Sequence, residues 1–214
     1  MPRFPGGILD LDGVVVDSEA LHLEATKIVF ERYELPLPDE GTDGFIGRTD
    51  RAIFSDAVEA SGRVLDVPKM LGVKNEVYET IADRMQLIPG SDAFIRWVAG
   101  SESKLALVTS SMRVNQQRAF DLFGLHPFFD VVITADDVQR TKPDPEPYET
   151  AVGRFGLDAR DCFVVEDSFN GVRSAKGAGC YVIGLTSSFP SKRLKDAGAD
   201  VVFDTFEEVR AHVA

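Results

Sequence analysis

One stretch decides the fold: Ile8-Leu9-Asp10-Leu11-Asp12-Gly13-Val14-Val15-Val16-Asp17. Two carboxylates interrupt an apolar run that is otherwise typical of a buried parallel strand. Because a buried carboxylate without a partner is costly, Asp10 and Asp12 indicate a bound cation, a shared proton, or both. Ligands bind beyond the carboxyl ends of strands in open α/β sheets, so both acids lie where a site is expected. The alternative is that they only cap the next segment.

Composition limits the function classes. The 214 residues are 44% hydrophobic, which allows a sizeable core in one domain, or in a domain carrying a smaller insertion. A net charge of −12 opposes nonspecific binding to nucleic acid or to an anionic membrane. We see neither a secretory signal pattern nor a membrane-spanning apolar run, and we expect a cytoplasmic monomer or weak homodimer. Cys162 and Cys180 are expected to be reduced thiols.

Short β-branched runs alternate with helical patterns along most of the chain. We expect strands near residues 7–12, 104–109, 130–134, 162–166, 181–185 and 200–203. Beyond the first gap, the connections between them have a dozen or more residues. This alternation predicts an α/β fold, with a Rossmann-like parallel sheet and helices on both of its faces.

The gap between the first two expected strands is too long for one crossover and has helical periodicity. Residues 17–88 are therefore expected to form an inserted α-helical domain, and residues 1–16 and 89–214 the main domain. Its first helix is predicted to begin at Ser18 and to bury Leu21, Ala25, Ile28 and Val29. Further helices are expected over about 50–61 and within 67–86, before a hinge at 87–90.

Three more polar clusters follow expected strands. Thr109, Ser110 and Ser111 offer hydroxyls and amides that can form an anion-binding nest or cap a helix near Arg113. Lys142 stands beside prolines that restrict the backbone, and can balance carboxylates or a phosphate.

The last cluster, Glu166-Asp167-Ser168, suits a hard cation. Oxygen ligands for Mg²⁺ are available from Asp10, Asp167 and the backbone carbonyl of Asp12. Charge would then be balanced by Lys142.

These motifs, in this order and on alternating strands, resemble those of the haloacid dehalogenase superfamily: Asp10-Leu11-Asp12-Gly13, Thr109, Lys142-Pro143 and Glu166-Asp167. The resemblance covers essentially the whole chain. The inserted domain is similar to the cap of the branch that contains β-phosphoglucomutase and many small sugar-phosphate phosphatases. Leu9 replaces the usual Phe before the first acid and leaves the chemical groups intact.

The resemblance implies a Mg²⁺-dependent phosphatase that acts on a small phosphorylated metabolite. Asp10 is then the nucleophile that forms an aspartyl-phosphate, and Asp12 is the general acid and base. Thr109 and Lys142 hold the phosphoryl oxygens. The implied metal ligands are Asp10, Asp12, Glu166 and Asp167, with Glu166 acting directly or through waters. Asp12 favours phosphate esters, since the dehalogenases and phosphonate-cleaving relatives lack this acid.

Candidate substrate-binding residues lie in both domains: His22, Gly47, Arg48, Arg51, Lys74, Ser110, Ser111 and Asn170. The segment from Gly47 to Arg51 resembles the specificity loop of the cap. Asp50 stands where the mutase carries an arginine, which favours a phosphatase over a β-phosphoglucomutase-type phosphotransferase without excluding the latter.

Other classes fit less well. A non-enzymatic phospho-acceptor signalling domain also combines Asp, Thr and Lys on a parallel sheet, but its phosphorylated acid ends the third strand of a shorter domain. A dinucleotide-binding domain would need a Gly-x-Gly-x-x-Gly turn after a strand, which this sequence lacks.

Overall fold

The computed structural model describes residues 3–38, 41, 45 and 50–214. They divide into two compact units, Met1–Asp17 with Gln86–Ala214, and Ser18–Met85. From its sequence, the inserted unit is expected to span residues 17–88. Among the described residues, no helix is both long enough and apolar enough to cross a membrane. Cys162 and Cys180 are free and buried.

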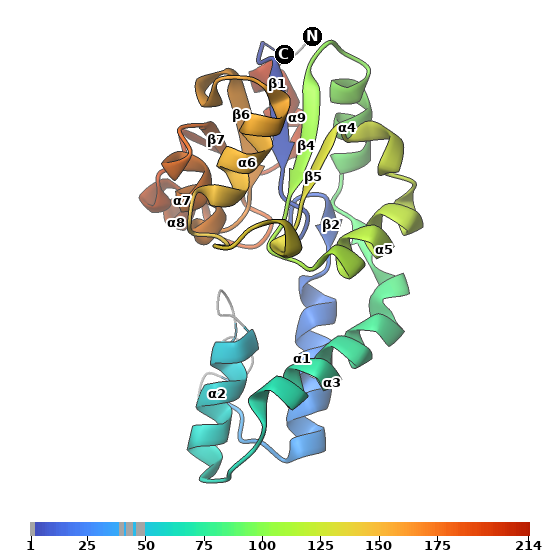
Figure 1. Cartoon of the computed structure of the whole chain (residues 1–214), viewed down its shortest axis with the longest axis vertical. Helices are drawn as coiled ribbons and strands as arrows, with labels where there is room; N and C mark the ends of the chain where they lie inside the picture. Colours follow the sequence, from blue (N-terminus) through green and yellow to red (C-terminus); the bar gives the residue numbers. More distant parts are fainter. Residues whose placement is uncertain (1–2, 39–40, 42–44, 46–49) are drawn as a thin grey trace. The chain divides into compact units, whose positions relative to one another are not determined.

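The first unit confirms the expected α/β fold. Its parallel sheet has the strand order β5-β4-β1-β6-β7-β8. The strands are β1 (Gly6–Leu9), β4 (Lys104–Val108), β5 (Val131–Ile133), β6 (Cys162–Glu166), β7 (Tyr181–Leu185) and β8 (Val201–Phe203). The chain runs outward from β1 to β4 and β5, and then returns to β6 on the other side (Figure 1). The carboxyl end of β1 therefore lies at a reversal of strand order, where α/β folds bind ligands.

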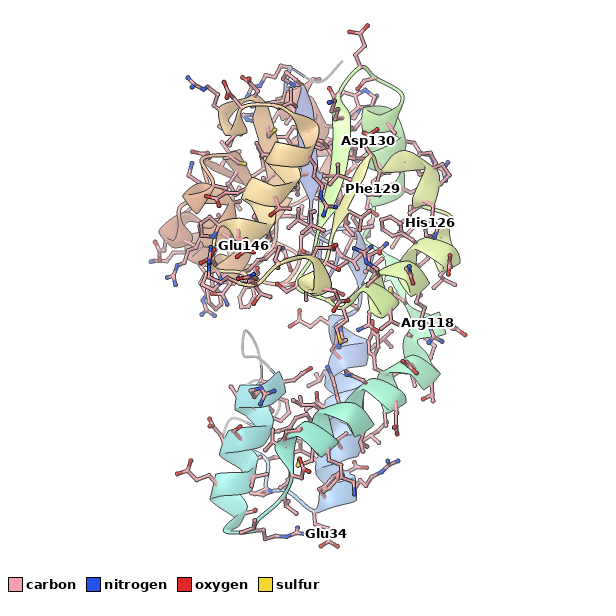
Figure 2. The ribbon with its side chains drawn as sticks, viewed as in Figure 1. Glu34, Arg118, His126, Phe129, Asp130 and Glu146 are labelled. Atoms are coloured by element: carbon pink, nitrogen blue, oxygen red, sulfur yellow. The ribbon has the colours of Figure 1, made fainter. Side chains whose placement is uncertain are left out.

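Helices cover both faces of this sheet, as Figure 1 shows. One face packs against α6 (Glu146–Phe155), α7 (Phe169–Gly177) and α8 (Ser191–Ala197), and the other against α4 (Ser91–Ala99) and α9 (Phe206–Val213). The connections also hold α5 (Arg113–Phe123), η3 (His126–Phe128), η4 (Ala135–Asp137) and η5 (Ala159–Asp161). Asp130, labelled in Figure 2, accepts a hydrogen bond from the backbone N of Leu105 (2.8 Å), which ties the start of β5 to β4.

The second unit is helical, with α1 (Glu19–Tyr33), α2 (Asp50–Ser61), α3 (Val67–Ile81) and η2 (Ala82–Arg84). Helix α3 packs against both α1 and α2. On α1, Leu21, Ala25 and Val29 are buried as expected, whereas Ile28 is half-buried. Glu34, labelled in Figure 2, ends α1 in the left-handed conformation with φ of 52°. The core of this unit is a cluster of buried residues: Val29, Phe30, Leu35, Phe45, Ile53, Phe54, Ala57 and Met70.

Two short strands were not expected. The two-residue strands β2 (Val16–Asp17) and β3 (Gln86–Leu87) pair antiparallel. The sequence predicts only helices within 17–88, so the strand residues at the two ends of this segment correct that prediction. Two residues are too few to produce the alternation of polar and apolar side chains by which a strand is predicted.

Close packing explains why β1 begins with glycine. A Cβ added to Gly7 would lie 2.6 Å from Cζ of Phe163, whose ring is fully buried. We expect Gly7→Ala to lower the free energy of unfolding by about 1–3 kcal/mol, because the ring must shift in a packed core. Urea denaturation measures this. The cost should shrink in a Phe163→Leu background; strictly additive effects of the two substitutions would contradict the contact.

Candidate active site

The loop after β1 brings two acids to the carboxyl edge of the sheet. Asp10 is buried and Asp12 half-buried. The loop is closed by hydrogen bonds from the backbone N atoms of Val15 (2.8 Å) and Val16 (2.9 Å) to the carbonyl oxygen of Leu11. Gly13 has φ of +78°, and a Cβ there would lie 2.0 Å from Oδ2 of Asp167. Glycine is thus required both by the turn and by the close approach of Asp167, the acid that follows β6.

Lys142 joins three neighbouring strands at this edge. Its Nζ donates to Oδ1 of Asp10 (2.8 Å), to Oε1 of Glu166 (2.6 Å) and to the carbonyl oxygen of Val108 (2.9 Å). An ammonium group has three N–H bonds, so each has an acceptor. Burial acts to lower the pKa of Lys142, but the charges of Asp10 and Glu166 outweigh it and raise this pKa above its usual value. The lysine is therefore charged throughout the physiological range.

The loop that carries Lys142 is itself held in place. Glu146, the first residue of α6, is labelled in Figure 2. Its carboxylate accepts hydrogen bonds from the backbone N atoms of Gln139 (2.8 Å) and Arg140 (3.1 Å). This contact fixes the backbone just before Lys142, so the ammonium reaches the acids from a defined loop.

Glu166, the last residue of β6, is fully buried and accepts hydrogen bonds at both oxygens. Its Oε1 receives Lys142 and the hydroxyl of Tyr148 (2.6 Å), and its Oε2 receives the backbone N (3.2 Å) and Oγ (3.0 Å) of Ser168. A carboxylate has about four lone-pair sites. The hydrogen bonds of Glu166 thus occupy its accepting capacity within the protein.

Three buried acids converge here. Carboxylate oxygens of Asp10, Glu166 and Asp167 lie within 4.8 Å of one another. Burial, aided by Glu166 and Asp12 and opposed by Lys142, raises the pKa of Asp10 to about 7. Burial and the charges of Glu166 and Asp10 also raise the pKa of Asp167 well above its usual value. A single lysine does not balance this charge, and clustered carboxylate oxygens are the ligands that a hard divalent cation prefers, so the residues fit such an ion.

Hydroxyl groups from the loop after β4 complete the edge. Thr109 is buried, and its Oγ1 accepts a hydrogen bond from the backbone N of Ser111 (2.9 Å). The Oγ of Ser111 donates to Oδ2 of Asp12 (2.7 Å), and Ser110 is exposed.

Of the two interpretations of these hydroxyls, the one in which they cap the following helix is wrong. The N-cap of α5 is Met112, and the backbone N of Arg113 donates instead to Oδ2 of Asp136 (2.9 Å). The hydroxyl of Thr109 instead accepts a hydrogen bond within its own loop, and that of Ser111 donates one to Asp12. Asn170, the other candidate on this unit, is half-buried in the first turn of α7.

The candidate residues of the helical unit fall into two groups. Lys74 is 2% exposed, and its Nζ donates to Oδ2 of Asp50 (2.7 Å) and lies 2.9 Å from Nδ1 of His22. The His22 ring stacks on Tyr78 with centroids 4.2 Å apart. Helices α1, α2 and α3 thus each contribute one member of a polar cluster. Arg51 is exposed on α2, whereas Gly47 and Arg48 lie outside the described residues.

Two residues at the acid cluster were not predicted from the sequence. Tyr148 donates to Glu166, and Nζ of Lys142 lies 5.1 Å from the centre of its ring. The hydroxyl of Ser188 lies beside the carboxylate of Asp167 and acts to lower its pKa. A signal existed for Ser188, because it belongs to a polar run that follows a strand, as the other clusters do. Tyr148 lies in the apolar face of α6, where a tyrosine is usually interpreted as core.

Comparisons with known proteins agree with this arrangement. The family model of the haloacid dehalogenase-like hydrolases matches residues 8–185. The chain is 32% identical to the validoxylamine A 7'-phosphate phosphatase of Streptomyces hygroscopicus subsp. limoneus, over 95% of this chain and 94% of that protein. It is 31% identical to a phosphorylated carbohydrates phosphatase of Thermotoga maritima, over 90% of each.

Solved structures show the same fold. A Thermotoga maritima protein provisionally described as a β-phosphoglucomutase superposes with a TM-score of 0.82 at 28% identity, covering 98% of this chain and 99% of that one. The matched segment contains Asp10, Lys142 and Asp167, the residues that the fold brings to one edge of the sheet. The chain belongs to the haloacid dehalogenase-like hydrolases.

Proposed function

We propose that this hydrolase is a Mg²⁺-dependent phosphatase that cleaves a small phosphomonoester, of the sugar-phosphate class, through a phosphorylated Asp10. One observation carries the proposal: the buried carboxylate of Asp10 lies 2.8 Å from Lys142, with a second acid, Asp12, on the same loop. Relatives named as phosphatases of validoxylamine A 7'-phosphate and of phosphorylated carbohydrates support the substrate class.

The reaction takes place in two displacements. A carboxylate oxygen of Asp10 attacks phosphorus, the bond from phosphorus to the substrate oxygen breaks, and Asp12 protonates the leaving alcohol. Asp12, now a carboxylate, then removes a proton from water as the water oxygen attacks phosphorus. The bond between phosphorus and Asp10 breaks and inorganic phosphate leaves. The hydrogen bond from Ser111 orients Asp12 for both proton transfers.

The cation and the hydrogen-bond donors serve the charge of the phosphoryl group. Asp10, Asp167 and the backbone carbonyl of Asp12 would hold Mg²⁺, which when bound neutralises negative charge on the phosphoryl oxygens. Because its oxygens already accept four hydrogen bonds, Glu166 is assigned to positioning Lys142 rather than to ligating the metal or its waters. The hydroxyl of Thr109, neighbouring amides and the charge of Lys142 would stabilise the transferring group.

The substitutions Asp10→Asn and Asp12→Ala separate the two chemical roles. Asp10→Asn removes the nucleophile and is expected to abolish phosphate release. Asp12→Ala removes the acid and base, so turnover should fall by about 10²–10⁴-fold. With acetyl phosphate, whose leaving group needs little protonation, this variant should accumulate a phosphoenzyme visible by intact mass spectrometry. Asp17→Asn, the exposed acid of the same stretch, is the control. Wild-type turnover in either purified active-site variant would refute the roles.

Removing one acid should stabilise the metal-free protein. The raised pKa values of Asp10 and Asp167 mean that the folded protein holds these protons more tightly than the unfolded chain. Its free energy of unfolding therefore decreases as pH rises from about 4 through 7. In EDTA at pH 8, Asp167→Asn should raise Tm by about 2–4 °C for each kcal/mol that it adds to the free energy of unfolding. The rise should be smaller at pH 5. Added Mg²⁺ should raise the Tm of the wild type and not of the variant. Scanning calorimetry tests both, and a lower metal-free Tm of the variant at pH 8 would contradict the account.

A β-phosphoglucomutase-type phosphotransferase is the second candidate, because a structural relative carries that provisional description. Both reactions share the core chemistry and differ in whether water or a sugar hydroxyl receives the phosphoryl group. In a screen of phosphorylated metabolites with Mg²⁺, we expect release of free phosphate without isomer interconversion. Both reactions are monitored by ³¹P NMR. Conversion of β-glucose 1-phosphate to glucose 6-phosphate faster than phosphate release would favour the mutase.

Which residues choose the substrate stays a prediction. The proposed set is His22, Gly47, Arg48, Arg51, Lys74, Ser110, Ser111 and Asn170. Alanine variants of Arg48 and Arg51 in the same screen test the cap loop. A changed substrate ranking with an unchanged requirement for Mg²⁺ supports a role in specificity.

A further inference from the structure

The loop after β7 reaches the acid cluster and has no role in the mechanism above. In the sheet, Glu166 of β6 is paired with Gly184 of β7. Because β7 ends one residue later, at Leu185, residues 186–190 leave the sheet beside Asp167. The loop therefore begins beside the strand end that carries Glu166 and Asp167.

Two serines of this loop contact the two segments that carry the acids. The Oγ of Ser187 donates to the carbonyl oxygen of Gly13, in the loop after β1. The hydroxyl of Ser188 lies beside the carboxylate of Asp167 and acts to lower the pKa of that acid. A Cβ built on Gly13 would lie 2.7 Å from Oγ of Ser188 and 2.0 Å from Oδ2 of Asp167. Hydroxyl, carboxylate and glycine thus meet at one point.

The loop is anchored on both sides of these serines. Before them, the backbone N of Thr186 donates to the carbonyl oxygen of Phe203 (3.1 Å). After them, Phe189 is buried and packs edge-on against Phe169, with centroids 5.4 Å apart. The guanidinium of Arg193 covers both rings, at 5.0 and 4.9 Å. A backbone fixed at both ends presents the Ser188 hydroxyl in a set position, so little entropy is lost when it holds a carboxylate.

We propose that Ser188 is a positioning residue that orients the carboxylate of Asp167 toward the divalent cation and so increases the affinity for that ion. The inference rests on the proposed Mg²⁺ site. A hydroxyl is a neutral donor, so it fixes one carboxylate oxygen without cancelling the charge that attracts the cation. Lys142 acts differently on Asp10, because it adds a positive charge. Loss of an outer hydrogen bond to a metal ligand typically weakens metal binding by about 10–100-fold.

The test measures Mg²⁺ binding without substrate. Purified full-length wild type, Ser188→Ala and Ser188→Thr are titrated with Mg²⁺ by calorimetry, and kcat is then measured with a phosphate ester as a function of Mg²⁺ concentration. Ser188→Ala should bind Mg²⁺ about tenfold or more weakly, with kcat mostly regained at saturating Mg²⁺. Ser188→Thr keeps the hydroxyl and should restore the affinity. Ser191→Ala, at the first position of α8, is the matched control and should change neither.

Mg²⁺ affinity of Ser188→Ala equal to that of the wild type would overturn the inference and leave the proposed function standing. A lower kcat that saturating Mg²⁺ does not restore, together with unchanged Mg²⁺ affinity, would also overturn the inference. If Ser188→Ala fails to fold, Ser188→Thr and Ser188→Val replace it, since they match in size and differ in the hydroxyl. Equal affinity in that pair overturns the inference. A wild type that binds no Mg²⁺ would instead refute the metal site of the proposed function, and this inference with it.

Discussion

The ammonium of Lys142 is the interaction on which the site depends. Its three hydrogen bonds join the loop after β1, the last carbonyl of β4 and the acid that ends β6, which are neighbours in the sheet. Removing one partner of a buried ion pair leaves an uncompensated charge and typically costs about 3–5 kcal/mol. Tyr148 and Ser168 also donate hydrogen bonds to Glu166, so the carboxylate that binds the lysine is itself fixed in position. The remaining carboxylates can be buried because this one cation is among them.

The cluster nevertheless carries more negative charge than the lysine balances. The pKa values of Asp10 and Asp167 are raised, chiefly by burial, which is the opposite of what a stabilising ion pair would do to an acid. Such an arrangement reduces the stability of the metal-free protein and is expected where function, rather than stability, places the groups. Gly13 allows the acids to lie this close together, since a larger residue would displace Asp167 from the loop that carries Asp10.

Much of the fold could be predicted because its signals are local. Buried parallel strands are short apolar runs, so the expected segments near 104–109 and 162–166 correspond to β4 and β6. Helices α1 and α2 follow from the spacing of apolar residues. The β2 and β3 pair could not be predicted, because each strand has only two residues and their pairing joins positions far apart in the chain. The capping of α5 by Asp136 instead of a nearby hydroxyl is also a contact across the chain, which local sequence does not reveal.

The sequence by itself determined which chemical groups are present, their order, and the strands that they follow, because strand ends and motif spacing are properties of contiguous residues. It therefore identified Asp10, Asp12, Lys142, Glu166 and Asp167 as one site and indicated the family. Only the tertiary structure decided how these groups share their hydrogen bonds. It assigned Glu166 to Lys142, Tyr148 and Ser168, and placed Lys74 between Asp50 and His22. It also brought Ser188 beside Asp167. Hydrogen bonding and burial depend on the packing of distant segments, so the strands and helices had to be assembled before the partners of each group were defined.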